Sequence, residues 1–195
     1  MLEGAQAVGS VPLEGEAELI ERAITGHEIA FTRLYDTHYD RVYRYILRPV
    51  RSVEDAEDLT QKVFLQAWRG LSRYRRTQSP FVAWLIAIAH NLTMSFFRSR
   101  KVNRSLEGDL PEAVEPPAPV AAIADLGEQE LVRDAILRLN PEQQQVITMR
   151  FFEGFECGEI AAAIGKSEGN VRVIQHRALQ KLRGVLEERE SHGKG

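Results

Sequence analysis

Apolar residues recur along most of this chain at steps of three and four, which is the spacing of one buried face on an α-helix. Phe31, Leu34, Tyr35 and His38 begin one such stripe, and Pro49 is expected to stop that helix because proline lacks the amide donor. No segment alternates apolar and polar residues over the length of a strand. The pattern therefore predicts an all-α protein.

Two more helices follow in the first half of the chain. Ser52 has N-cap spacing for a helix whose apolar stripe runs through 56–67, and Gly70 suits its end. Ser79 and Pro80 form a cap and a first-turn proline before "FVAWLIAIAHNLTMSFFRSRK". Because that segment is apolar on nearly all sides, we expect the helix to be mostly buried.

A Pro-, Ala- and acid-rich segment, "EGDLPEAVEPPAPVAAIAD", interrupts the helical pattern and has the composition of an extended linker. It divides the chain into two small helical domains, over residues 15–103 and 127–190, with the acidic linker at 104–126. The first dozen residues have no periodic pattern and are expected to be frayed.

The second domain ends in "GEIAAAIGKSEGNVRVIQHRALQKLR", which has the parts of a helix-turn-helix. Gly165 permits a left-handed turn, and Ser167 can cap the second helix. The alternative is an amphipathic hairpin whose polar face is only solvated. If the unit reads DNA, the side chains available to bases and phosphates are Lys166, Ser167, Glu168, Asn170, Arg172, Val173, Gln175, His176 and Arg177.

Composition narrows the class of protein further. The net charge of −3 argues weakly against nucleic acid, but basic residues cluster around 69–76, 98–104 and 166–183. One cysteine, Cys157, excludes an internal disulfide framework, and we expect it on a surface turn. The five histidines lack metal-ligand spacing, and there is no phosphate-binding glycine loop, so we expect neither an enzyme nor a cofactor or metal. Without a signal peptide or membrane span, the expected location is the cytoplasm.

Three segments of the first domain carry a more specific signal: "AFTRLYDTHYDRVYRYI", "DAEDLTQKVFLQAWRGLSRYR" and "PFVAWLIAIAHNLTMSFFRSRK". In this order and at this spacing they resemble a sigma factor of bacterial RNA polymerase, of the small extracytoplasmic-function group. The resemblance covers about 17–186. It implies that the first domain is sigma region 2, a helical bundle, and that the second is sigma region 4, which reads the minus-thirty-five promoter element.

The resemblance also implies docking on core RNA polymerase, through the clamp helices of the largest subunit and through the flap. On the helix after Ser52, an inward apolar stripe leaves acids and apolar residues on another face, a mixture that suits a protein interface. A solvated acidic helix face is the alternative. The expected polymerase-binding residues are Asp55, Asp58, Gln61, Phe64, Leu65 and Trp68.

In the resembled group the following loop and helix read and melt the minus-ten element and trap a flipped base. Aromatic residues interleaved with basic ones can hold single-stranded DNA by stacking and phosphate pairing. The expected minus-ten residues are Tyr74, Arg75, Arg76, Asn91, Arg98, Arg100 and Lys101.

Further partners follow only from the resemblance. An anti-sigma factor is expected, whereas membrane insertion is not. The linker either enters the RNA exit path of the polymerase or is a passive spacer. Ser95, Asn170 and Ile174 stand where many members of the group carry an acid, a threonine and a basic residue, so the preferred promoter letters stay open. A stand-alone helix-turn-helix regulator is the competing function.

Overall fold

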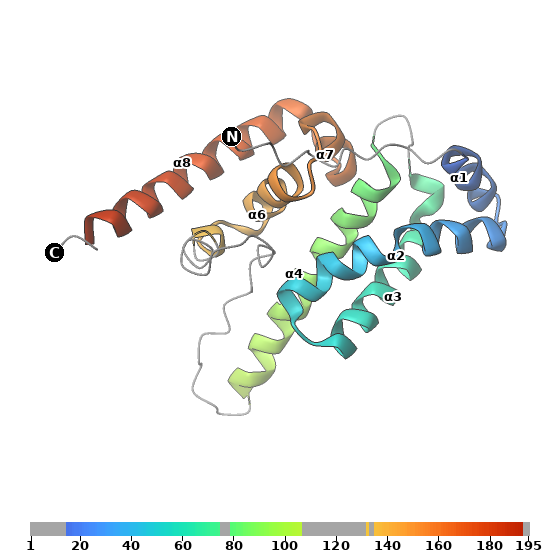
Figure 1. The fold of residues 1–195 in the computed structure, drawn as a ribbon, viewed down its shortest axis with the longest axis horizontal. Coiled ribbons are helices and arrows are strands. Elements are labelled where there is room, and N and C mark those ends of the chain that lie inside the picture. Colours follow the sequence, from blue (N-terminus) through green and yellow to red (C-terminus); the bar gives the residue numbers. More distant parts are fainter. Residues whose placement is uncertain (1–14, 75–78, 107–131, 133–134, 193–195) are drawn as a thin grey trace, which may run out of the picture.

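The chain folds into helices joined by short turns (Figure 1). The structure is a computed structural model that describes residues 15–74, 79–106, 132 and 135–192, with the side chains of 101–106 and 186–192 left undescribed. No β-strand occurs in the described part of the chain, so the all-α prediction is confirmed. The segment expected to fray and the acidic linker from residue 107 onward lie outside the described residues.

The N-terminal half is a bundle in which α2 is central. Its elements are α1 (Glu16–Ile24), α2 (Glu28–Val50), α3 (Val53–Gly70), the short 3-10 helix η1 (Leu71–Arg73) and α4 (Phe81–Leu106). Helix α2 contacts α1, α3 and α4, and α3 also packs against α4. In Figure 1, α4 runs the length of this bundle on the side that faces the C-terminal helices.

The expectation that Pro49 stops α2 is wrong, because the helix continues through Val50 with Pro49 inside it. A proline in the last turn removes one backbone N–H donor, but the next residue can still adopt helical backbone angles before the helix ends. The helix ends instead at Arg51, which has φ 58° and donates its N–H to the carbonyl of Leu47. The predicted cap of α3 is confirmed, since Ser52 Oγ accepts the N–H of Asp55 at 3.2 Å.

Helix α4 is buried on nearly all sides, as its composition predicts. By length and apolar composition it could cross a membrane over Phe81–Arg100, but 61% of that window is buried inside the fold. Its apolar surface is therefore accounted for by packing between two sets of helices.

The C-terminal helices form a second, smaller group. They are α6 (Pro141–Ile147), a π-helical turn η2 (Thr148–Phe152), α7 (Cys157–Ile164) and α8 (Glu168–His192). Asn140 caps α6 in a full capping box with Gln143. Helix α8 packs against α6 and α7 and then extends beyond them (Figure 1).

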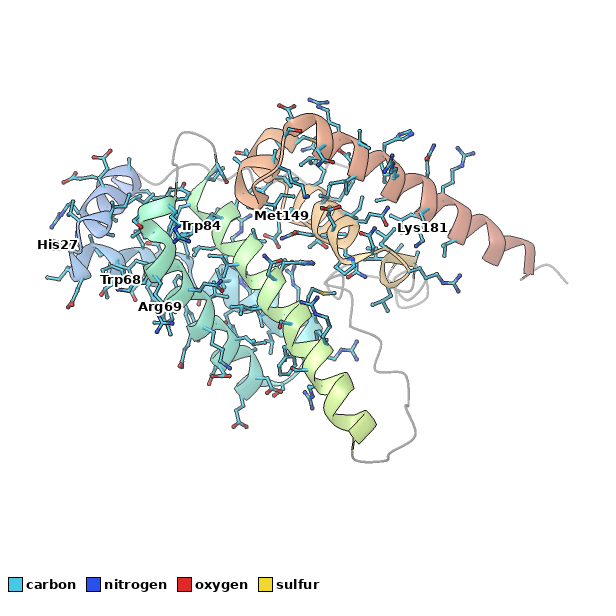
Figure 2. The ribbon with its side chains drawn as sticks, turned by 180° about the vertical axis from the view of Figure 1, so that it is seen from behind. His27, Trp68, Arg69, Trp84, Met149 and Lys181 are labelled. Atoms are coloured by element: carbon cyan, nitrogen blue, oxygen red, sulfur yellow. The ribbon has the colours of Figure 1, made fainter. Side chains whose placement is uncertain are left out.

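Two hydrophobic clusters hold this arrangement together. The smaller lies within the C-terminal group, where Ile136, Leu139 and Ile147 surround Ala178. The larger is shared: residues of α2, α3 and α4 belong to the same cluster as Phe155 and Ile160 of the C-terminal group. Met149, labelled in Figure 2, also belongs to this shared cluster and is fully buried.

Candidate DNA and polymerase interfaces

Helices α7 and α8 form the predicted helix-turn-helix. Ile160 and Ala161 of α7 pack toward Val171 and Ile174 of α8, and all four side chains are buried. Gly165 ends α7 with φ 71°, which is the left-handed conformation that glycine was expected to permit here. The turn then passes to the cap residue of α8, Ser167, whose Oγ accepts the N–H of Asn170 at 3.2 Å.

The outer face of α8 presents polar and basic side chains to solvent (Figure 2). Arg172 is exposed and donates twice to Glu168 Oε1 one turn earlier, at 2.6 and 3.1 Å. The hydrogen bond and the charge of Glu168 raise the pKa of Arg172, which keeps the guanidinium charged. Val173 is 46% exposed and is an apolar group available to a thymine methyl. Ser167, Asn170, His176 and Arg177 are exposed on the same face.

Two predicted reading residues are less accessible than the sequence indicated. Gln175 is half-buried, and its Oε1 accepts from Cys157 Sγ at 3.2 Å. Lys166 forms an ion pair with Glu142 of α6 at 2.5 Å, a partner that the sequence did not indicate.

The expectation that Cys157 lies on a surface turn is wrong. Cys157 is the first residue of α7 and only 8% exposed, because α8 covers it.

The expected minus-ten residues fall into three groups. Tyr74 is buried against Phe81 and Trp84, and its hydroxyl donates to the carbonyl of Ser79 at 2.5 Å. This position corrects the predicted DNA contact of Tyr74 to a structural role, because it ties together the two ends of the loop. Arg75 and Arg76, in the loop before α4, lie outside the described residues, as does the side chain of Lys101 near the end of α4.

Asn91, Arg98 and Arg100 are exposed along α4. The Arg100 guanidinium lies 5.3 Å from the centre of the Phe96 ring, and its Nη1 lies 3.3 Å from Asp55 Oδ2. Stacking of a cation on an aromatic ring fixes the direction of the guanidinium, so it stays available to a phosphate beside the helix.

The predicted polymerase face of α3 borders an open apolar groove of about 390 Å³ between α2 and α3. Leu65 is 49% exposed at its edge, whereas Phe64 is buried and forms its floor against Phe31 and Tyr35. Trp68 packs on Phe31 with ring centroids 4.8 Å apart, and Figure 2 shows it at the α1 end of the molecule. The full lining is Glu28, Phe31, Thr32, Tyr35, Gln61, Phe64, Leu65 and Trp68.

The α2 side of this groove was not predicted from the sequence. The spacing of Phe31 and Tyr35 indicated only the buried face of a helix. Phe31 and Tyr35 are each partly exposed, and Tyr35 continues into a row with Tyr39 and Tyr43 along α2. Burial raises the pKa of Tyr35 and Tyr39, so both remain neutral donors. The number of aromatic residues in that stripe is the feature of the sequence that could have indicated a binding groove, because aromatic side chains are enriched at interfaces.

One acid, Glu28, lines the groove, and two more stand earlier on α3. Asp58 is exposed and pairs with Lys62 at 2.5 Å, one turn along α3. Asp55 is half-buried at the start of the helix, and Gln61 is exposed at the groove wall. An apolar groove lined by Glu28, with acids on the preceding turns of α3, suits a partner helix that carries apolar anchors and basic flanks. Among the described residues, no group of three or more potential metal ligands comes together.

Comparison with known proteins agrees with both domains. The family Sigma-70 region 2 matches residues 34–102, and the family Sigma-70, region 4 matches residues 135–184. The chain is 38% identical over 171 residues to the ECF RNA polymerase sigma factor BldN of Streptomyces coelicolor, covering 87% of this chain but 65% of that relative. It is 32% identical over 159 residues to the ECF RNA polymerase sigma factor SigL of Mycobacterium tuberculosis, covering 80% of this chain and 88% of SigL.

Solved structures show the same fold at lower identity. CnrH, solved in complex with the cytosolic domain of CnrY, matches with a TM-score of 0.57 and 24% identity over 89% of this chain and 98% of CnrH. The sigma factor RpoE of Bartonella quintana, solved with the anti-sigma factor NepR, matches with a TM-score of 0.56 and 24% identity over 80% of this chain and 96% of RpoE. The chain therefore belongs to the ECF sigma factors of RNA polymerase, a class of transcription-initiation factors.

Proposed function

We propose that this chain binds core RNA polymerase and directs it to promoters. In this proposal α3 and the groove beside it dock on the clamp helices of the largest polymerase subunit, and the C-terminal group contacts the flap. Helix α8 reads the minus-thirty-five element. Helix α4 and the loop before it engage the minus-ten element and help to nucleate melting. The chain performs no covalent chemistry and needs no cofactor.

The observation that carries this proposal is the separation of two chemically different surfaces. The outer face of α8 offers Asn170, Arg172 and Arg177, side chains that form hydrogen bonds with base edges and phosphates. The α3 groove offers apolar area beside Glu28 and the acids earlier on α3, whose charge repels DNA and attracts a basic protein partner. A DNA reader and a protein-docking face on one chain are the two parts that a promoter-specificity subunit requires.

Two substitutions test this assignment by acting on one surface each. Arg172→Ala is expected to weaken promoter binding by about tenfold or more while sparing polymerase binding, since a good base contact is worth about 1–3 kcal/mol. Lys181→Ala removes an exposed charge further along α8 and is the matched control. The measurements are promoter binding by the reconstituted holoenzyme and pull-down with core polymerase.

Asp58→Arg is expected to impair polymerase binding first, because it reverses an exposed charge on α3 one turn before Gln61 of the groove. Glu21→Arg makes the same charge change on the exposed face of α1 and should leave polymerase binding intact. Equal loss of both binding activities in a folded Arg172→Ala protein would show that the reading face is misplaced. Failure of the unaltered chain to bind core polymerase would refute the proposed function.

A stand-alone helix-turn-helix regulator is not favoured, because it would leave the α3 groove without a role. We further propose an anti-sigma factor as partner, supported by the anti-sigma complex of the related RpoE. We place the activity in the cytoplasm, where RNA polymerase works. The acidic linker, predicted at 104–126 with its first three residues still in α4, joins the two DNA-reading domains and either enters the RNA exit path or acts as a spacer.

A further inference from the structure

The first turns of α8 hold an acid and an arginine in one defined arrangement. Arg172 donates to Glu168 Oε1 through both Nε and Nη2, at 3.1 and 2.6 Å. The two residues have i,i+4 spacing, which places their side chains on the same face of the helix. Because two N–H groups meet one carboxylate oxygen, both the position and the plane of the guanidinium are fixed.

The carboxylate of Glu168 is turned toward the protein and not toward the outer face of α8. Its second oxygen, Oε2, lies 3.5 Å from the point where a Cβ on Gly158 of α7 would stand. Because Gly158 has no side chain, the carboxylate can approach the backbone of α7 there. With one oxygen on Arg172 and the other beside α7, Glu168 is placed to hold its neighbour and is poorly placed to contact a base itself.

The remaining edge of Arg172 suits a ligand with two adjacent acceptors. A guanidinium has one edge formed by Nε and Nη2 and a second edge formed by Nη1 and Nη2. Glu168 occupies the first edge, and in the described part of the chain the second edge has no partner. Its two parallel N–H groups match O6 and N7 of guanine in the major groove. The side chain of Arg172 is 67% exposed, so this edge is open to solvent.

Charge favours a base edge over a backbone phosphate as the ligand of this arginine. The carboxylate of Glu168 offsets the charge of Arg172, which weakens the attraction to a phosphate, but the donors of the second edge are unchanged. Arg177, further along α8, is exposed and has no ion-pair partner among the described residues, so it is the better phosphate contact. Arg172 is therefore the arginine of this face that is built for sequence reading.

We propose that Glu168 is a specificity-determining positioning residue, which holds Arg172 so that its second guanidinium edge reads one guanine of the minus-thirty-five element. This inference rests on the proposed function and names one base that α8 selects. Ordering a long side chain on binding costs about two- to twelvefold in affinity, and Glu168 removes that cost in advance. Only the correct base uses the ordered edge, so losing Glu168 lowers the preference for guanine.

The test measures base preference with the holoenzyme reconstituted from the full chain and core RNA polymerase. Duplexes with a randomised minus-thirty-five segment are selected by binding and then sequenced. The unaltered chain should prefer guanine at one position by about 5- to 150-fold, the range for a bidentate base contact. Glu168→Ala should reduce that preference by about two- to twelvefold. Glu21→Ala, which removes an exposed carboxylate from α1, is the control and should not change it.

Three further arms test whether Glu168 acts through Arg172. Glu168→Gln should restore part of the preference, because its amide oxygen can still accept from Arg172. Replacing the selected guanine by 7-deazaguanine removes only the N7 acceptor; it should weaken binding of the unaltered chain by about fivefold or more and have little effect on Arg172→Ala. In the Arg172→Ala background, Glu168→Ala should leave base preference unchanged.

A guanine preference that falls at one position with Glu168→Ala, and only when Arg172 is present, would support the proposal. An unchanged preference would overturn it, and so would an equal loss at every position, which indicates a structural role. A loss of the same size in the Arg172→Ala background would also overturn it, because Glu168 would then read the base itself. These three outcomes leave the proposed function standing, whereas a chain that binds no core polymerase would refute both.

Discussion

Acidification should destabilise this protein through the imidazole of His90. The ring is 4% exposed between α2 and α6; Nδ1 bonds to the Tyr45 hydroxyl, and Nε2 has no hydrogen-bond partner. Burial lowers the pKa of His90 to about 4, against a smaller opposing effect of the Pro141 backbone. The native state therefore holds a neutral imidazole, whereas the unfolded chain takes up a proton near pH 6.5.

The sign and size of the effect follow from these two values. A depressed pKa gives stability that is present above pH 6.5 and is lost as the pH falls from 6.5 toward 4. Between pH 7.5 and pH 5, His90 alone should reduce the free energy of unfolding by about 2 kcal/mol, and by about 3.4 kcal/mol once both states are protonated.

Urea unfolding followed by circular dichroism at the two pH values measures this loss. His90→Gln is the comparison, because glutamine can still bond to Tyr45 but does not titrate. Carboxylates and the other histidines contribute to both proteins and cancel in the difference. The unaltered chain should lose about 2 kcal/mol more than His90→Gln on acidification. Equal losses would refute the assignment of a buried neutral imidazole.

Three further predictions use the helix-turn-helix and the α3 groove. In a thermal melt, Gly165→Ala should lower the free energy of unfolding by about 1 kcal/mol, because its φ of 71° strains any residue with a Cβ although that Cβ meets no atom within 4 Å. Gly169→Ala is the control: its Cβ also meets no atom within 4 Å, and the change should be neutral or stabilising. Leu65→Ser should weaken core polymerase binding in a pull-down while changing stability by less than about 0.5 kcal/mol, because the side chain is exposed. Cys157 should react with a thiol reagent far more slowly in the native chain than in urea, because it is buried.

Local chemistry made several elements predictable. The caps at Ser52, Asn140 and Ser167 and the turn at Gly165 each depend on a residue type whose preference is strong and short-range. Such features need no knowledge of the rest of the fold.

Features that depend on distant segments could not be predicted. Cys157 is covered by α8, and Glu153 meets Arg41 across 112 positions of the chain. The groove beside α3 is completed by Phe31 and Tyr35 of α2, whose spacing indicated only a core face. The packing of the C-terminal group against α4 left no signal except the unusually apolar circumference of that helix.

The ion pair between Asp55 and Arg100 links two surfaces that the proposed function assigns to different partners. A phosphate that takes Arg100 releases the Asp55 carboxylate, and a basic partner at Asp55 releases the guanidinium. Thermodynamic reciprocity then requires each partner to strengthen the other by the same factor. An exposed pair is worth at most about 1 kcal/mol, so this cooperativity is limited to about fivefold and fades as salt screens the pair.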